Sequence, residues 1–182
     1  MKCPACKSGN LVSGYLEDLF LARTCDHCGG NWLLLEDYLH WLQRTPPQPL
    51  AASIEYEIMD SKHVLLCPVT GTMMLKYRIS GATDHRLDLS SDISGIWMDK
   101  GEWELLKSEG LAHQLNSIFT EPWQRRIQSE RTAEILSARY EDKFGAENYQ
   151  KVKEFREWLL QQGNHLELLA YLIAKDPYSV KR

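Results

Sequence analysis

Short stretches that alternate apolar and polar residues dominate the chain up to residue 110, and such alternation is typical of strands. Two of them, Leu11–Leu16 and Leu19–Thr24, predict a hairpin with its turn at Glu17-Asp18. A third, Ser53–Met59, predicts a half-exposed strand. Between residues 64 and 110 the apolar positions are dense enough to predict a packed unit with a hairpin and a short helix.

Residues 111–182 instead place apolar side chains three and four positions apart, which predicts amphipathic helices. Thr120 and Pro122 form a helix start signal, and Gly145 and Gly163 mark stops. We expect three helices, over residues 121–143, 146–162 and 165–175. The last is almost wholly apolar, so we expect it to be buried, either within this chain or in a dimer interface.

Four of the five cysteines form two close pairs near the N-terminus, Cys3 with Cys6 and Cys25 with Cys28. The spacing C-x2-C-x18-C-x2-C is typical of a zinc site with four cysteine ligands. Each pair forms a knuckle that points two sulfurs at one spot, and the predicted hairpin brings the knuckles together at Zn–S distances of about 2.3 Å. Because four thiolates leave no open coordination position, we expect the metal to stabilise the fold and not to catalyse a reaction.

The four-cysteine pattern leaves other chemistry open. Iron uses the same four thiolates and is a minor alternative to zinc. A redox C-x-x-C motif is expected once, beside a βαβ unit, and disulfides are disfavoured in a reducing compartment. His27 is an alternative ligand, although its position inside the second knuckle suits a solvent-facing side chain better. A segment of about 45 residues buries too little apolar surface to fold alone, so loss of any one of the four cysteines should unfold it.

The chain also contains a second, weaker copy of this segment. Cys3-Pro4 recurs as Cys67-Pro68, 64 residues further on, and Gly30-Asn-Trp32-Leu33 recurs as Gly95-Ile-Trp97-Met98, 65 residues further on. A helical pattern follows the tryptophan in both copies. We interpret this as an internal duplication with one inserted residue.

The second copy lacks three of the four thiols, because the aligned positions hold Thr70, Ser90 and Ile93. We therefore expect it to bind no metal and to be stabilised by apolar burial, with Cys67 as a small buried side chain. A site rebuilt around Cys67 from nearby acids and a histidine is a disfavoured alternative, since its hard and soft ligands show no recognisable spacing. Its candidate residues are Asp84, His85, Asp88 and Asp92.

The first copy resembles the TFIIB-type zinc-finger family of small zinc-ribbon proteins, through Cys3-Pro-x-Cys6 and Cys25-x-x-Cys28-Gly29-Gly30-x-Trp32-Leu33. The family's acidic Gly-Glu-Leu helix start is replaced by Leu35-Glu36-Asp37, and is better kept in the second copy as Gly101-Glu102. The resemblance covers residues 1–45 and, more loosely, 64–110. It implies a zinc-ribbon fold, and nucleic-acid binding by analogy with transcription factors.

Together these patterns predict an α+β protein with four segments. They are a four-cysteine zinc ribbon over residues 1–45, a proline-rich linker and strand over 46–63, a degenerate metal-free zinc-ribbon-like repeat over 64–110 and a helical region over 111–182. Three prolines among residues 46–49 predict an extended spacer, which we favour over a proline-rich ligand for another protein's aromatic groove.

Charge and composition narrow the possible functions. The 182 residues hold 21 basic and 25 acidic side chains, a net charge of −4, and no segment is a basic arm for phosphate contacts. Arg125 and Arg126 are the most basic local feature, and neighbouring glutamates balance them. No run approaches the roughly 18 apolar residues of a membrane helix, and no secretory signal is visible, so we expect a cytoplasmic protein without a membrane partner.

Motifs of the common hydrolases, nucleotide-binding enzymes and zinc proteases do not occur, so we expect a protein that is not an enzyme. The favoured hypothesis is a zinc-binding interaction module with a protein partner, because the chain is acidic, has six tryptophans and ends in an apolar helix. A nucleic-acid-binding, transcription-related zinc finger is the first alternative. A thiolate-based redox or metal-responsive regulator is the second, and a homo-oligomer is compatible with all three.

Overall fold

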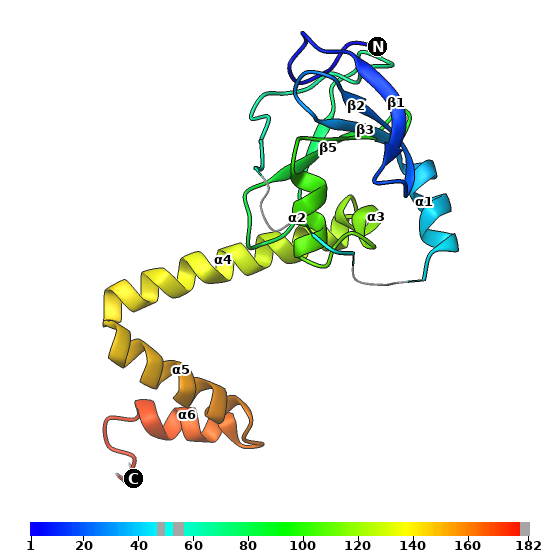
Figure 1. Ribbon diagram of the computed structural model, residues 1–182. Coiled ribbons are helices and arrows are strands. Elements are labelled where there is room, and N and C mark those ends of the chain that lie inside the picture. Colours follow the sequence, from blue (N-terminus) through cyan, green and yellow to red (C-terminus); the bar gives the residue numbers. More distant parts are fainter. Residues whose placement is uncertain (47–49, 53–56, 179–182) are drawn as a thin grey trace. The chain divides into compact units, whose positions relative to one another are not determined.

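The computed structural model describes residues 1–46, 50–52 and 57–178, and the chain divides into two compact units, Met1–Glu130 and Arg131–Arg182 (Figure 1). The first unit contains all the described strands, the helices α1 to α3 and the start of α4. The described part of the second unit is helical. This is the α+β architecture predicted from the sequence.

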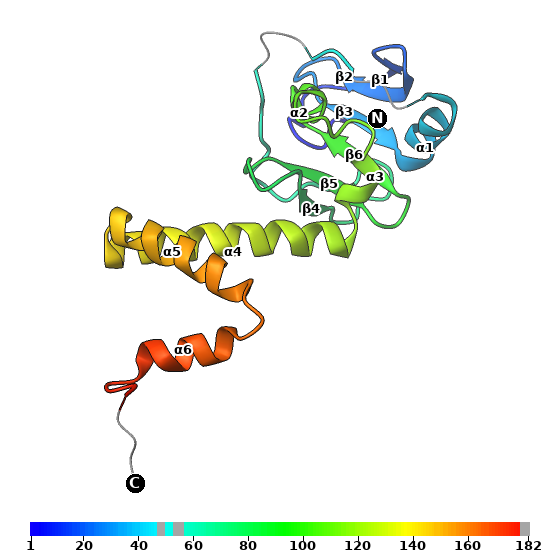
Figure 2. The ribbon, with the colours of Figure 1, turned by 90° about the horizontal axis from the view of Figure 1, so that it is seen from below.

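The described strands form one antiparallel six-stranded sheet, in the order β1-β2-β3-β6-β5-β4 (Figure 2). Their bounds are Leu11–Leu16 for β1, Phe20–Cys25 for β2, Asn31–Leu34 for β3, Leu75–Arg78 for β4, Arg86–Ser90 for β5 and Gly95–Met98 for β6. The sheet thus joins the strands of residues 1–45 to those of residues 64–110 through the pair β3–β6.

The predicted N-terminal hairpin is present, with β2 one residue later than expected at each end. Glu17 and Asp18 both have positive φ angles, 50° and 60°, as a two-residue turn between twisted antiparallel strands requires. The register pairs Leu11 with Cys25, so the hairpin returns the second cysteine pair to the level of the first.

The neighbouring strands β3 and β6 place two tryptophans opposite each other. Trp32 pairs with Trp97 in the register. The Trp97 ring lies against Gly30, immediately before β3, and the Trp32 ring lies against Gly95, the first residue of β6. A Cβ atom on Gly30 would overlap the Trp97 ring, and one on Gly95 would overlap the Trp32 ring. Each set of three strands is followed by a helix, α1 (Leu35–Arg44) or α2 (Glu102–Ser108). This reciprocal arrangement is what a duplication predicts, and the duplication itself stays a prediction.

The main apolar core lies on one face of the sheet, under the helices of the first unit. Phe20 of β2 makes edge-on or tilted ring contacts with Tyr38, Trp41 and Trp103, at centroid separations of 5.4 to 5.7 Å. The Tyr38 hydroxyl donates to the Ala112 carbonyl at 3.0 Å and thereby ties α1 to the chain after α2. A smaller apolar cluster on the other face contains Trp32, Trp97 and the cysteine knuckles.

The C-terminal helices follow the predicted pattern closely. They are α3 (Leu115–Ile118), α4 (Glu121–Phe144), α5 (Ala146–Leu160) and α6 (His165–Ile173). The last two end two residues earlier than expected. The expectation that the last helix is buried within the chain is wrong, because none of the residues of α6 is buried.

The linker contains less regular structure than expected in its described part. Glu57–Met59, the end of the predicted strand over Ser53–Met59, form no strand, and residues 53–56 lie outside the described residues, as do residues 47–49 of the proline-rich segment. The Met59 N–H donates to the Lys100 carbonyl at 2.9 Å, so the end of the linker lies against the chain before α2.

Candidate metal centre

Two tight turns place the four N-terminal cysteines. In the first, the Cys3 N–H donates to the Gly9 carbonyl at 3.0 Å, and Lys7 has a φ of 58° that closes the turn. In the second, the Cys25 N–H donates to the Gly30 carbonyl at 2.8 Å, and Gly29 has a φ of 73°. Because β2 ends at Cys25 beside the start of β1, the hairpin directs both turns toward one point.

The four sulfur atoms have the spacing of a tetrahedral metal site. All four Sγ atoms lie within 4.8 Å of one another, and the separations are 3.6 Å for Cys3–Cys28 and 3.7 Å for Cys6–Cys25. Four sulfurs bound at about 2.3 Å to a tetrahedral ion lie about 3.8 Å apart. The donor set and its geometry therefore fit a metal ion held by four thiolates.

Backbone N–H groups surround the sulfurs. The Cys6 N–H lies 3.5 Å from the Cys3 sulfur, the Gly9 N–H 3.4 Å from the Cys6 sulfur and the Cys28 N–H 3.5 Å from the Cys25 sulfur. Such donors favour the thiolate over the thiol, because they partly compensate its negative charge. A Cβ atom on Gly9 would overlap the Cys25 sulfur, so the close approach of the first turn requires glycine there.

Burial and hydrogen bonding act on these thiols in opposite directions. Burial raises the pKa of Cys28 to about 11 and also raises the pKa of Cys3. The pKa of Cys6 is lowered to about 6, chiefly by a hydrogen bond from the Ser8 side chain. Since metal ligands must be deprotonated, a bound cation would have to displace protons from the buried thiols. His27 is exposed and is not part of the cluster.

A similar turn at Cys67 forms without a thiolate set. The Cys67 N–H donates to the Thr72 carbonyl at 2.7 Å, Gly71 has a φ of 76°, and the Thr70 N–H lies 3.4 Å from the Cys67 sulfur. Cys67 is buried, as predicted. Because Thr70, Ser90 and Ile93 replace the other thiols, this turn offers no four-thiolate site.

The disfavoured alternative site around Cys67 is not assembled among the described residues. Asp84 pairs with Arg78 at 2.7 Å, Asp88 pairs with Lys76 at 2.8 Å, and Cys67 belongs to no metal-ligating group of the described chain.

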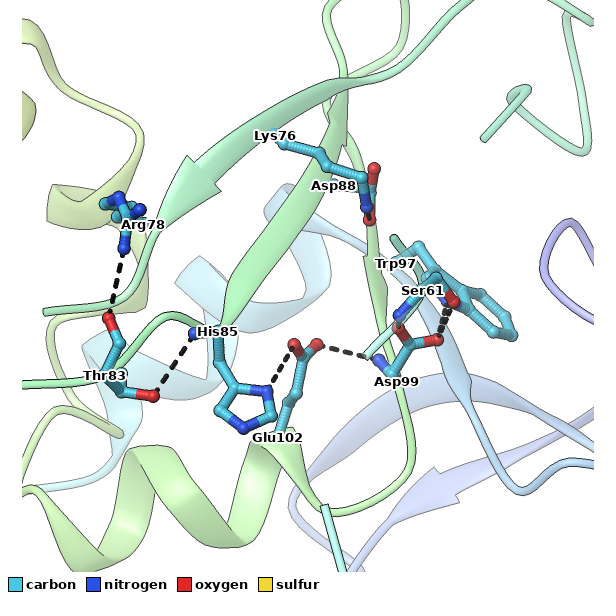
Figure 3. Close-up of polar contacts among 9 residues, drawn as sticks. All are labelled: Ser61, Lys76, Arg78, Thr83, His85, Asp88, Trp97, Asp99 and Glu102. Atoms are coloured by element: carbon cyan, nitrogen blue, oxygen red, sulfur yellow. Dashed lines mark hydrogen bonds and ion pairs between the residues drawn. The ribbon is translucent and has the colours of Figure 1, made fainter. Parts of the chain in front are cut away.

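His85 lies in a different group, with Asp60 and Glu102 (Figure 3 shows His85 beside Glu102). These three residues are scattered over 42 positions with no motif spacing, so the sequence contains no signal that joins them. Burial, followed by the nearby Asp99 carboxylate, raises the pKa of Glu102 well above its ordinary value.

Comparison of the sequence with known protein families supports a zinc-binding role for the four-cysteine site. Residues 2–44 match the model of the transcription factor zinc-finger family, the TFIIB-type zinc ribbon. The resemblance seen in the cysteine and tryptophan pattern is thus confirmed for this segment, and for residues 64–110 it stays a prediction. Searches of curated proteins and of solved structures gave no match. No helix in the described part of the chain has the length and apolar character needed to cross a membrane.

Proposed function

We propose that this protein is a non-catalytic zinc-binding protein whose C-terminal helices bind a protein partner. The zinc-ribbon match and the four clustered sulfurs support a metal site, and zinc is favoured because structural sites of this ligand set and spacing are typical of Zn²⁺. Elemental analysis of the purified chain tests the ion directly. At least one zinc per chain supports the proposal, and iron in its place supports the alternative metal.

The observation that carries the partner proposal is the exposed apolar surface of α5 and α6. Leu166 and Ile173 of α6 have 70% and 75% of their surface exposed, and several neighbouring apolar and aromatic side chains are exposed as well. These neighbours are Val152, Phe155, Trp158, Leu160, Leu169, Tyr171 and Leu172. Many exposed apolar side chains on two successive helices mark a candidate interaction site.

Charge favours a protein over a nucleic acid as the partner. The net charge is −4, and the most basic local feature is largely neutralised. Arg125 pairs with Glu121 at 2.6 Å, and Arg126 lies 3.6 Å from Glu130 and over the Trp123 ring. Binding to phosphates is driven by uncompensated positive charge, and the neighbouring glutamates reduce that charge here. The nucleic-acid alternative is supported by the name of the matching family.

Affinity capture with matched variants tests the partner proposal. The double variant Leu166→Glu with Ile173→Glu changes the two most exposed large apolar residues of α6, and Lys153→Glu on α5 makes the same change in net charge without touching an apolar residue. We expect a defined protein that copurifies with the unaltered chain and the Lys153→Glu variant, and not with the double variant. Equal capture by all three would contradict the proposal.

A binding titration across salt concentrations tests the nucleic-acid alternative. The probes are labelled single- and double-stranded DNA and RNA with the zinc-loaded chain. Absence of binding at low salt removes this alternative, because phosphate contacts are strongest there. Saturable binding that weakens steeply with salt supports it over the protein proposal.

The half-buried positions of Cys6 and Cys28 are the feature that favours the redox or metal-responsive alternative. Zinc release under mild peroxide tests it, and retention of the metal rules it out. We also propose a cytoplasmic location, since thiols that serve as metal ligands need a reducing compartment.

We further propose that the two sets of three strands arose by duplication of one zinc ribbon. The supporting features are the repeated order of strand, strand, strand and helix, the reciprocal Trp32–Gly95 and Trp97–Gly30 contacts, and the two cysteine turns with the same N–H contact to the cysteine sulfur.

A further inference from the structure

A second group of metal-ligating side chains lies outside the four-cysteine site. Asp60, His85 and Glu102 each direct one ligand atom to a common region, within 4.8 Å of one another. Asp60 belongs to the linker, His85 immediately precedes β5, and Glu102 is the first residue of α2. Three segments that are distant in the sequence therefore meet here.

Glu102 is the unusual member of the group. Its side chain is fully buried, and only one of its carboxylate oxygens accepts a hydrogen bond, from the Asp99 N–H at 2.8 Å (Figure 3). The other oxygen, Oε1, has no hydrogen-bond partner among the described residues. It faces the Nδ1 atom of His85 at 3.9 Å, which is beyond hydrogen-bonding distance, and this nitrogen also has no described hydrogen-bond partner.

The surroundings of Glu102 are acidic. The carboxylates of Asp60, Asp88 and Asp99 all act electrostatically on it. Two buried or half-buried lysines of the unit are engaged with other acids: Lys76 with Asp88 at 2.8 Å, and Lys107 with Glu17 and Glu104. An ionised carboxylate buried without a compensating positive charge is costly, so Glu102 favours its neutral form until a bound cation supplies that charge.

The loops that hold Asp60 and His85 are themselves fixed by hydrogen bonds. The Asp99 carboxylate accepts bonds from the Trp97 indole N–H and the Ser61 hydroxyl, both at 2.7 Å, and from the Ser61 N–H. These bonds anchor the residue next to Asp60. The Thr83 hydroxyl accepts the His85 N–H at 3.2 Å (Figure 3). Preorganisation of this kind is what supporting residues provide around metal ligands.

We propose that Asp60, His85 and Glu102 form a second metal site, which binds a divalent first-row transition ion such as Mn²⁺ or Zn²⁺ with water completing its coordination. One imidazole with two carboxylates is a ligand set these ions accept, whereas thiolates are absent from it. Ligand atoms bound to one ion at about 2.1 Å lie about 3 to 4 Å apart, so the observed group needs only a small closing movement.

Such an ion would join the linker, the β4–β5 loop and the start of α2. His85 and Glu102 belong to the half of the sheet that lacks the four-thiolate site, and Asp60 lines a pocket that Cys6 and Cys28 also line. The proposal stands apart from the function proposed above, since it uses no residue of α5, α6 or the cysteine knuckles.

The site is tested by titration with Mn²⁺ of the full chain loaded with one equivalent of Zn²⁺, which the four thiolates bind first, followed by the paramagnetic resonance signal of free Mn²⁺. Mn²⁺ prefers oxygen and nitrogen ligands, so it does not compete for the four thiolates. We expect saturable binding of one Mn²⁺ per chain and a rise in the midpoint of thermal unfolding. Glu102→Gln and His85→Asn should each weaken binding at least tenfold, and His40→Asn, at an exposed histidine of α1, should leave it unchanged.

Asp60→Asn keeps the test decisive if the buried variants fold poorly, because Asp60 is exposed and its replacement leaves the core intact. Weaker Mn²⁺ binding by this variant, with the four-cysteine zinc still present, supports the site. Absence of saturable binding by the unaltered chain with both Mn²⁺ and added Zn²⁺, or equal binding by all variants, overturns it. Zinc content at the four cysteines, measured in the same samples, tests the proposed function separately.

Discussion

The two cysteine turns of the sheet, at Cys3 and at Cys67, share a backbone conformation but differ in what stabilises them. In both, the N–H three residues after the cysteine lies close to the cysteine sulfur. The Cys6 nitrogen is 3.5 Å from the Cys3 sulfur, and the Thr70 nitrogen is 3.4 Å from the Cys67 sulfur. Only the first turn belongs to a described four-thiolate group. The turn itself therefore does not require a metal. The second half of the sheet, residues 64–110, must be stabilised by another interaction.

This interaction is apolar burial, because the larger apolar cluster is divided unequally between the two halves of the sheet. Of the 18 buried residues in the larger described cluster, six precede residue 46 and twelve follow residue 64. The second half gains this share because α2, α3 and the start of α4 contribute Leu106, Leu115, Trp123 and Ile127 beneath its strands. The first half is covered by α1 and by Trp103 of α2, which packs on Phe20, and its smaller share of apolar burial is what a structural zinc would compensate.

The largest predicted effect is that of Cys3→Ala. Cys3 and Cys67 are matched, since each has 2% of its surface exposed, so loss of burial alone would affect both equally. A structural zinc contributes on the order of 10–16 kcal/mol of apparent binding free energy, which exceeds the whole stability of a typical small domain. We expect Cys3→Ala to lose the metal and to unfold β1 and β2, measured as zinc content and amide hydrogen exchange.

A chelator added to the unaltered chain provides the control for this prediction, because it removes the metal without removing a side chain. It should reproduce the loss of protection in β1 and β2. Retention of slow exchange in these strands after the metal is gone would show that apolar packing holds the first half as it holds the second.

Truncation of the core under the second half should have the next largest effect. Leu106 of α2 is fully buried, so Leu106→Ala should lower the free energy of unfolding by about 2–5 kcal/mol, measured by urea denaturation. Leu106→Met, which conserves volume, should cost less than about 1.5 kcal/mol. Zinc content should stay unchanged in both variants, since Leu106 lies on the sheet face opposite the knuckles.

The spacing of local motifs was sufficient to predict the N-terminal hairpin, the cysteine cluster and the C-terminal helices. The alternation in residues 11–24 and the turn placed at Glu17-Asp18 predicted the hairpin to within one residue, and the cysteine spacing predicted which sulfurs meet. Helix bounds from residue 121 onward were right to within two residues, because start and stop signals there are strong.

Contacts between distant segments could not be predicted in the same way. The pairing of β3 with β6 depends on two glycines, Gly30 and Gly95, that leave room for tryptophan rings from the opposite strand. The group of Asp60, His85 and Glu102 has no motif spacing, because a loop, a strand end and a helix start supply one residue each. An apolar composition in α6 did not imply burial either, since composition does not specify what covers a helix.

An ion pair between the two halves should contribute less than the core. The Lys107 ammonium, on α2, lies 2.6 Å from Glu17 in the β1–β2 turn and 2.8 Å from Glu104. Burial alone would lower the pKa of Lys107, but the two glutamates outweigh it and raise that pKa, so the side chain stays charged through the neutral range. We expect Lys107→Met to cost about 2 kcal/mol, below the usual value for a buried pair because 41% of the Glu17 side chain is exposed.

A double-variant cycle with Glu17→Gln isolates this contact from the packing of the lysine stem. A coupling free energy near zero would show that the β1–β2 turn is held by the Trp103 indole, which also donates to Glu17, and not by the ion pair.

The smallest predicted effect is that of Cys67→Ala, which makes in the second turn the same change as Cys3→Ala in the first. Only a small buried sulfur is lost, and the Thr70 N–H that lies near it belongs to an exposed residue that water can reach. We expect a loss of about 1 kcal/mol in urea denaturation and unchanged zinc content. Because both cysteines are equally buried, the difference between the two alanine variants measures what the metal contributes to one half of the sheet, and equal effects would mean that neither turn depends on it.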